Sequence, residues 1–115
     1  MTPTENTQFR HILEARKGEL EKLLRNREAI AVDTSPDMLD QIQHATEREL
    51  AIGNLERDSA RLREVQGALR RVYLGTFGIC LECEEKISLK RLAALPWTAT
   101  CLVCQEVADG ERIAA

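Results

Sequence analysis

Apolar residues recur at helical spacing in the first part of the chain. Between residues 5 and 31 they fall near one face of a predicted helix, at Phe9, Leu13, Leu20, Leu23 and Ile30. The apolar stripe is narrow, and Arg16 and Arg27 interrupt it. Such a stripe is typical of a helix that pairs with one partner helix rather than packing into a thick core.

A second and clearer pattern extends over residues 36–74. Its inward positions alternate in steps of four and three, with one polar member, at Ala51, Leu55, Asp58, Leu62, Val65, Leu69 and Val72. This heptad spacing predicts a helix that pairs along a seam. Ser35 can cap its first turn, Pro36 suits its first position, and Gly75 can end it in left-handed backbone.

The break between the two patterns is short, so the two helices are predicted to run antiparallel as neighbours. The predicted fold is mainly α: a long antiparallel two-helix coiled-coil hairpin over residues 1–74, with its tip at about residues 33–40. A small globular end follows over residues 75–115, with a short C-terminal helix near residues 102–109. We expect a monomer, because the two helices of one chain can bury each other's apolar seam residues without a second chain.

All four cysteines lie in the C-terminal region, in two Cys-x-x-Cys pairs separated by 17 residues: Cys80, Cys83, Cys101 and Cys104. Each pair can bring two thiolates to one metal ion, and two pairs complete a tetrahedral site for Zn²⁺. Four sulfur ligands leave no open position for water, so one structural zinc ion is predicted. The zinc should supply folding energy that the few apolar residues of this region cannot.

The composition argues against several classes of protein. The net charge is −3, whereas a protein that binds DNA directly usually carries a basic patch. No apolar run is long enough to cross a membrane, and the polar first residues do not resemble a signal peptide, so a cytoplasmic protein is expected. His11 and His44 stand isolated, and neither a nucleophile with its base nor a glycine-rich phosphate loop is recognisable, so no enzyme is predicted.

Carboxylates surround the predicted hairpin tip at Asp33, Asp37 and Asp40. Such residues are usually helix caps and solvated surface. A long hairpin, however, exposes its turn far from other residues, and Asp37 and Asp40 are spaced to share one helical face. These two carboxylates could therefore reach a recessed site that is rich in metal or basic groups.

Basic residues lie between the two cysteine pairs, at Lys86, Lys90 and Arg91. They either offset the negative charge of a tetrathiolate site or form a contact surface for an acidic partner or a phosphate. Trp97 is expected to pack over the predicted zinc finger of residues 75–115 (the finger) rather than to stack on a nucleic-acid base.

Several of these segments resemble a known family when they are taken together. They are Phe77-Gly78-Ile79-Cys80-Leu81-Glu82-Cys83, Ile87, Lys90-Arg91-Leu92, Pro96, Cys101-Leu102-Val103-Cys104 and, at the tip, Asp37-Met38-Leu39-Asp40. The chain resembles the DksA/TraR family of bacterial transcription factors. The resemblance implies binding at the rim of the secondary channel of RNA polymerase, with the acidic tip near the active centre, where it alters open-complex stability. It assigns Asp37 and Asp40 to the tip and makes Lys90 and Arg91 candidate polymerase contacts.

Four positions depart from the family pattern. Ile42 replaces the alanine that follows the second tip acid, and it is much bulkier. Three basic positions that grip guanosine tetraphosphate, the alarmone of the stringent response, are here Glu64, Leu95 and Gln105. The resemblance therefore implies polymerase binding with a weakened dependence on this alarmone, because two cations are lost and one charge is reversed.

Two other functions remain open from the sequence. A zinc-stapled coiled-coil adaptor or scaffold would use the exposed face of its helices to bind another protein. A nucleic-acid-binding zinc ribbon is opposed by the acidic charge balance and by an aromatic content of only 3 %.

Overall fold

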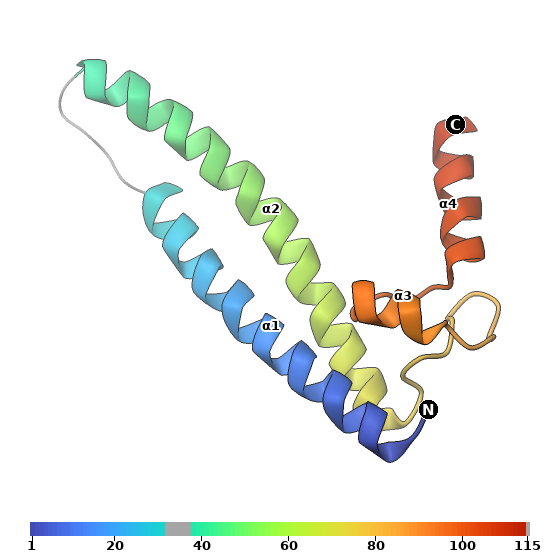
Figure 1. Ribbon diagram of the computed structural model, residues 1–115. Helices are drawn as coiled ribbons and strands as arrows, with labels where there is room; N and C mark the ends of the chain where they lie inside the picture. Colours follow the sequence, from blue (N-terminus) through green and yellow to red (C-terminus); the bar gives the residue numbers. More distant parts are fainter. Residues whose placement is uncertain (32–37, 115) are drawn as a thin grey trace. The chain divides into compact units, whose positions relative to one another are not determined.

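The computed structural model describes the backbone of residues 1–31 and 38–114, and the side chains of residues 1–26 and 45–111. Over these ranges the chain forms the helices α1 (Pro3–Ala31), α2 (Met38–Leu74), α3 (Leu89–Ala94) and α4 (Leu102–Ala114) (Figure 1). The mainly helical fold is confirmed, and α1 and α2 lie side by side. None of the described helices has the length and apolar character that crossing a bilayer requires.

Internal contacts divide the chain into two compact units. One consists of residues 1–15 and 64–115, and the other of residues 16–63. Each long helix therefore contributes to both units. The division predicted from the sequence, at residue 75, follows secondary structure rather than contacts, and it stays a prediction.

The predicted seam of α2 is confirmed by burial. All seven seam residues are buried or half-buried, including the polar Asp58. Val65 is fully buried, and Ala51 and Leu69 are buried. The steps of four and three residues keep one face of a helix turned toward a single neighbour, which explains why this pattern was predictive.

The predicted stripe of α1 needs one correction. Phe9, Leu13 and Leu20 are buried as expected, but Leu23 is exposed. The half-buried residue of that turn is Leu24. At 3.6 residues per turn, Leu24 lies about 40° from the centre of the buried face and Leu23 about 60°, so the step of four is preferred to the step of three.

In the unit of residues 1–15 and 64–115, both long helices contribute to one small core. The Phe9 ring of α1 contacts the Phe77 ring, which follows α2, with 5.4 Å between the ring centroids. The Tyr73 hydroxyl donates a hydrogen bond to a Glu14 carboxylate oxygen at 3.3 Å. Fully buried Leu92 adds α3 to this core. This packing joins the end of α2 to the finger.

Helix α4 is longer than predicted. It extends to Ala114, whereas the pattern had placed its end near residue 109. Gly110 lies within this helix. An interior glycine weakens a helix by about 1 kcal/mol relative to alanine and does not by itself end it.

Two glycines of the long helices should respond oppositely to the same substitution. Gly75 ends α2 with a φ of +78°, whereas Gly18 lies inside α1 with open space where a Cβ would be. We expect Gly75→Ala to destabilise the protein by about 1–2 kcal/mol, because an L side chain is strained in left-handed backbone. Gly18→Ala should stabilise it by about 0.5–1 kcal/mol, because alanine restricts the unfolded chain.

Denaturant unfolding of the zinc-loaded protein measures both effects as shifts of the midpoint at an unchanged slope. Equal shifts in the same direction for the two variants would contradict the assigned C-cap at Gly75.

Candidate zinc site

The first cysteine pair lies in a tight turn of backbone. Ile79 and Lys86 form an antiparallel bridge across this turn. The Cys80 amide donates to the Glu85 carbonyl at 2.8 Å, and the Glu84 amide donates back to the Cys80 carbonyl at 3.0 Å. Glu84 adopts a φ of +62°, which lets the chain reverse directly after the pair. The turn thus holds Cys80 and Cys83 on one side of the finger.

The second cysteine pair is positioned by the start of α4. Cys101 directly precedes this helix, and Cys104 lies in its first turn. The Cys104 amide points at the Cys101 sulfur over 3.5 Å. The Leu81 amide donates a hydrogen bond to the Ala99 carbonyl at 2.9 Å. This bond joins the turn of the first cysteine pair to the segment that precedes the second pair.

The four sulfurs gather where the spacing predicts. Among the described residues, Cys80, Cys83, Cys101 and Cys104 form the cluster whose ligand atoms all lie within 4.8 Å of one another. The Cys83 and Cys101 sulfurs are 3.7 Å apart. Four sulfurs at about 2.3 Å from one tetrahedral zinc ion would be separated by about 3.8 Å. The cluster is consistent with one structural zinc.

The acidity of these thiols shows why they suit a cation. A backbone hydrogen bond from Cys83 lowers the pKa of the Cys80 thiol to about 6. The neighbouring Cys101 thiol raises the pKa of Cys104 to about 12. Four adjacent thiols therefore resist ionising together, because each new negative charge opposes the next. A bound divalent cation removes this opposition, which is the chemistry of a structural tetrathiolate site.

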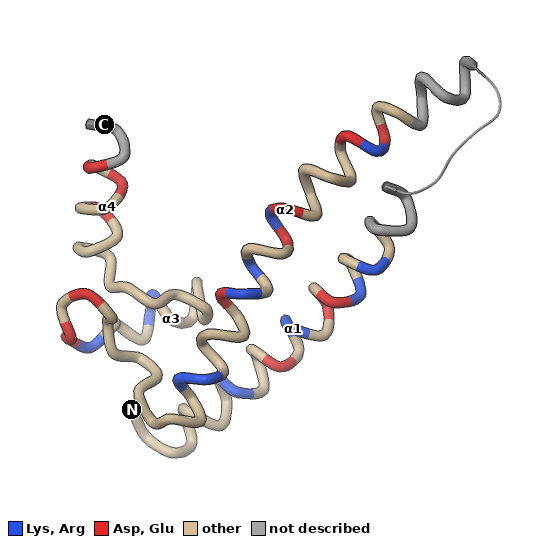
Figure 2. The backbone as a smooth tube through the Cα atoms, turned by 180° about the vertical axis from the view of Figure 1, so that it is seen from behind, with Lys and Arg blue, Asp and Glu red and all other residues tan. Residues whose placement is uncertain are grey.

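The surface of the first turn is acidic. Glu82, Glu84 and Glu85 are exposed beside Lys86. Figure 2 shows acidic and basic positions close together in the loop between α2 and α3. Lys90 is exposed on α3 and remains available to a partner. Near the cluster, this distribution does not form the continuous basic surface of a nucleic-acid ribbon.

Arg91 has a different environment from Lys90. Its Nε donates to the Thr100 carbonyl at 3.0 Å, and its Nη2 donates to the Thr98 hydroxyl at 3.3 Å. This half-buried side chain is therefore engaged within the finger. Its assignment as a polymerase contact stays a prediction.

Arg71 was missed by sequence reasoning. Its Nη2 lies 3.5 Å from the Trp97 carbonyl oxygen and 3.3 Å from that of Thr98. Burial lowers the pKa of this guanidinium, and the neighbouring Arg70 lowers it further. The only signal in the sequence was an arginine between the seam positions Leu69 and Val72, which does not identify acceptors 26 residues later.

The predicted tip residues lie at the edge of what the structure describes. Asp37 lies outside the described residues. Asp40 and Ile42 belong to the first turns of α2, but their side chains lie outside the described ones. Their roles stay predictions.

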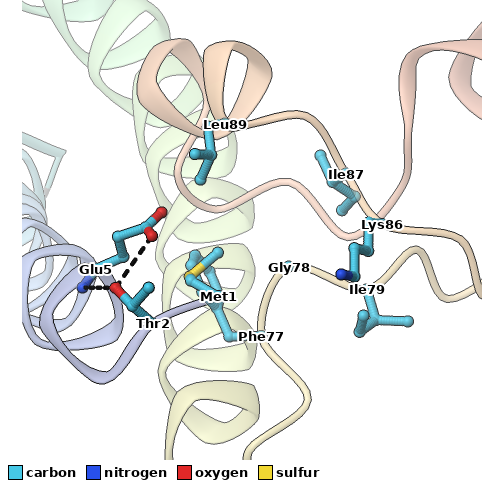
Figure 3. A pocket seen from close by; sticks show the side chains of 9 residues that line it. All are labelled: Met1, Thr2, Glu5, Phe77, Gly78, Ile79, Lys86, Ile87 and Leu89. Carbon is cyan, nitrogen blue, oxygen red and sulfur yellow. Dashed lines mark hydrogen bonds between the residues drawn. The ribbon is translucent and has the colours of Figure 1, made fainter.

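A separate cavity of about 430 Å³ lies between the start of α1 and the finger. Figure 3 shows Met1, Phe77 and Ile87 among its lining, with the Thr2 hydroxyl bonded to Glu5. That hydroxyl also accepts the Glu5 amide at 3.2 Å and so caps the helix. The lining combines apolar side chains with a helix cap, which gives it no evident catalytic constellation.

Comparison with known proteins agrees with the finger and with the helices. Residues 75–110 match the family model described as the prokaryotic dksA/traR C4-type zinc finger. An uncharacterized protein of Aquifex aeolicus is 40% identical over 73 residues, which cover 63% of this chain and 50% of that protein. This chain therefore spans about half the length of that relative.

Two further relatives match nearly the whole chain. The RNA polymerase-binding transcription factor DksA of Escherichia coli K12 is 27% identical over 112 residues, covering 95% of this chain and 74% of DksA. The structure of transcription factor DksA2 from Pseudomonas aeruginosa superposes with a TM-score of 0.85 at 25% identity, covering 97% of this chain and 88% of that one. These relatives are named as transcription factors, in agreement with the prediction that the chain is not an enzyme. Residues 75–110 therefore match the dksA/traR C4-type zinc finger, and with its cysteine cluster and its paired long helices the chain as a whole is similar to DksA transcription factors.

Proposed function

We propose that this protein binds a bacterial RNA polymerase and regulates the initiation of transcription. The observation that carries the proposal is the extent of the similarity to DksA proteins. The alignment with the E. coli protein covers 95% of this chain, and the superposition on the structure of DksA2 covers 97% of it. A zinc finger alone occurs in many contexts, whereas a C4 finger joined to two long paired helices is a far more specific combination.

The family resemblance suggests separate roles for the finger and for the paired helices. The finger would dock at the rim of the secondary channel, where exposed Lys90 is a candidate contact. The paired helices would then pass inward and carry Asp37 and Asp40 toward the active centre. Two carboxylates there could change the electrostatics around the catalytic metal and so alter the stability of the open complex.

We also propose that guanosine tetraphosphate affects this protein only weakly. Glu64 is exposed and negative, and Leu95 is half-buried and apolar. Gln105 is engaged in the finger, because it accepts from the Thr100 hydroxyl at 3.2 Å and donates to Asp109 at 3.0 Å. None of these three side chains offers the cation that a phosphate requires.

The test is binding of the zinc-loaded full-length chain to bacterial core RNA polymerase, followed by gel filtration or by an optical biosensor. We expect a stable complex that E. coli DksA displaces, because both would occupy the same site. Guanosine tetraphosphate should strengthen this complex less than it strengthens the complex of E. coli DksA measured beside it. A chain that does not bind polymerase would remove the proposal, and a full alarmone response would remove only its last part.

A coiled-coil adaptor is the second candidate, and one observation favours it. Leu50 and Ile52 are 64% and 47% exposed on α2, on both sides of the buried seam residue Ala51. Single exposed apolar residues are common on protein surfaces, so the feature is weak. Substituting both by serine would disrupt an adaptor but leave polymerase binding through the finger intact.

A further inference from the structure

The segment that leads into the second cysteine pair has no regular secondary structure of its own. Residues 97–100 lie between α3 and α4, outside any helix or strand. Buried carbonyl groups in such a segment need hydrogen-bond donors from elsewhere. The next residue is Cys101, so the placement of these four residues decides where two of the four sulfurs lie.

The four carbonyl oxygens of this segment all have donors, and three of them are bonded to arginine. The Trp97 and Thr98 carbonyls accept from Arg71 of α2. The Thr100 carbonyl accepts from Arg91 of α3. The remaining one, from Ala99, accepts the Leu81 amide of the first cysteine turn. Two guanidiniums from two helices thus replace the backbone pairing that a strand would have provided.

Arg91 makes the more specific of the two contacts. Its Nε and Nη2 reach two different groups, the Thr100 carbonyl and the Thr98 hydroxyl. That hydroxyl in turn donates to the same Thr100 carbonyl at 3.0 Å. Thr98 is only 8% exposed, so its hydroxyl is largely shielded from water. The planar, forked guanidinium matches two acceptors at once, which a lysine ammonium cannot do with the same geometry.

Arg71 connects this segment to the end of α2. Its own carbonyl accepts the Thr76 amide at 2.9 Å and the Phe77 amide at 3.2 Å, which closes the end of the helix. Its side chain meanwhile bonds the Trp97 and Thr98 carbonyls. A single residue therefore holds both the helix end and the approach to Cys101.

We propose that Arg71 and Arg91 are positioning residues of the zinc site. They hold residues 97–100 so that Cys101 and Cys104 meet the first cysteine pair in tetrahedral geometry. The inference needs a metal at the four sulfurs, but it does not depend on a polymerase partner. It assigns to Arg91 a role inside the finger in place of, or in addition to, contact with another protein.

The test compares zinc transfer from the full-length, zinc-loaded protein to a chromogenic chelator, 4-(2-pyridylazo)resorcinol. We expect Arg71→Ala and Arg91→Ala each to accelerate transfer by about 10-fold to 100-fold, the range found when residues that support metal ligands are removed. The controls are Arg63→Ala and Arg70→Ala, which remove exposed cations of α2. These controls should stay within about twofold of the wild type, as exposed substitutions usually do.

Trp97 gives a second readout at the segment itself, since it is the only tryptophan of the chain. In the zinc-loaded Arg71 and Arg91 variants, its emission should shift toward that of the metal-free wild type, while the far-ultraviolet circular dichroism of the long helices stays unchanged. A purely structural effect would change both signals together. If both signals change together, the proposal is overturned.

Conservative variants show whether the hydrogen-bond geometry of Arg91 or only its positive charge matters for zinc transfer. Arg91→Lys keeps the charge but loses the fork, so it should transfer zinc nearly as fast as Arg91→Ala. Thr98→Val removes the shared hydroxyl and should also accelerate transfer, which provides a test even where an arginine variant does not fold. Wild-type transfer rates in Arg91→Ala and Thr98→Val, or equal acceleration in the two control variants, would overturn the proposal.

Discussion

Chelation of the zinc ion is expected to unfold the finger at residues 75–110, and Cys80→Ser is expected to have the same effect. Structural zinc binding is worth about 10–16 kcal/mol in small zinc fingers. The buried apolar residues of this finger are few, with Phe77, Ile87 and Leu92 as the largest. Such a core cannot replace a contribution of that size. The long helices should keep most of their helical signal, because their seam does not involve the cysteines.

Metal analysis should give one zinc per chain, and Trp97 fluorescence with circular dichroism should follow unfolding as chelator is added. Cys104→Ser provides an independent removal of a ligand from the second pair. Acidification should release the metal as well, because protons compete for the thiolates. A finger that keeps its Trp97 emission in excess chelator would show that its apolar contacts suffice without metal.

The long helices and the cysteine cluster were predictable because each follows a repeat that is local in the sequence. The heptad steps of α2 determine which side chains face a neighbour, whatever that neighbour is. The two Cys-x-x-Cys pairs likewise define a tetrahedral site by spacing alone. Leu23 shows the limit of this reasoning, since steps of three and four both continue a stripe and only the actual partner decides between them.

The contacts by which Arg71 and Arg91 hold the segment before Cys101 could not be predicted in the same way. The acceptors of Arg71 are backbone carbonyls 26 and 27 residues later, and every residue carries such a group. No residue type therefore marks the partner, and the contact exists only once the finger has folded against α2. The sequence shows Arg91 only as a positively charged residue between the two cysteine pairs. Its hydrogen bonds to Thr98 and Thr100, which fix the side chain within the finger, are visible only in the structure.

Neutralising the two tip acids should abolish regulation and leave polymerase binding intact. Asparagine has nearly the size of aspartate, so Asp37→Asn with Asp40→Asn removes negative charge while the helix start stays close to its original form. Charged contacts are worth about 1.5–3 kcal/mol each. The effect of the protein on open-complex lifetime should therefore be smaller in the double variant by about 100-fold or more. Ile42→Ala should instead strengthen regulation, because it restores the smaller side chain of the family pattern.

The measurement is open-complex lifetime and promoter output in a purified transcription reaction, with polymerase binding measured on the same proteins. The matched control is Glu49→Gln with Glu56→Gln, which removes the same charge from exposed positions farther along α2. Regulation by this control at the wild-type level, with loss only in the tip variant, would place the activity at Asp37 and Asp40. Equal loss in both would attribute the effect to the overall charge of the helix. Full regulation by the tip variant would show instead that the finger, bound at the channel rim, acts without the carboxylates.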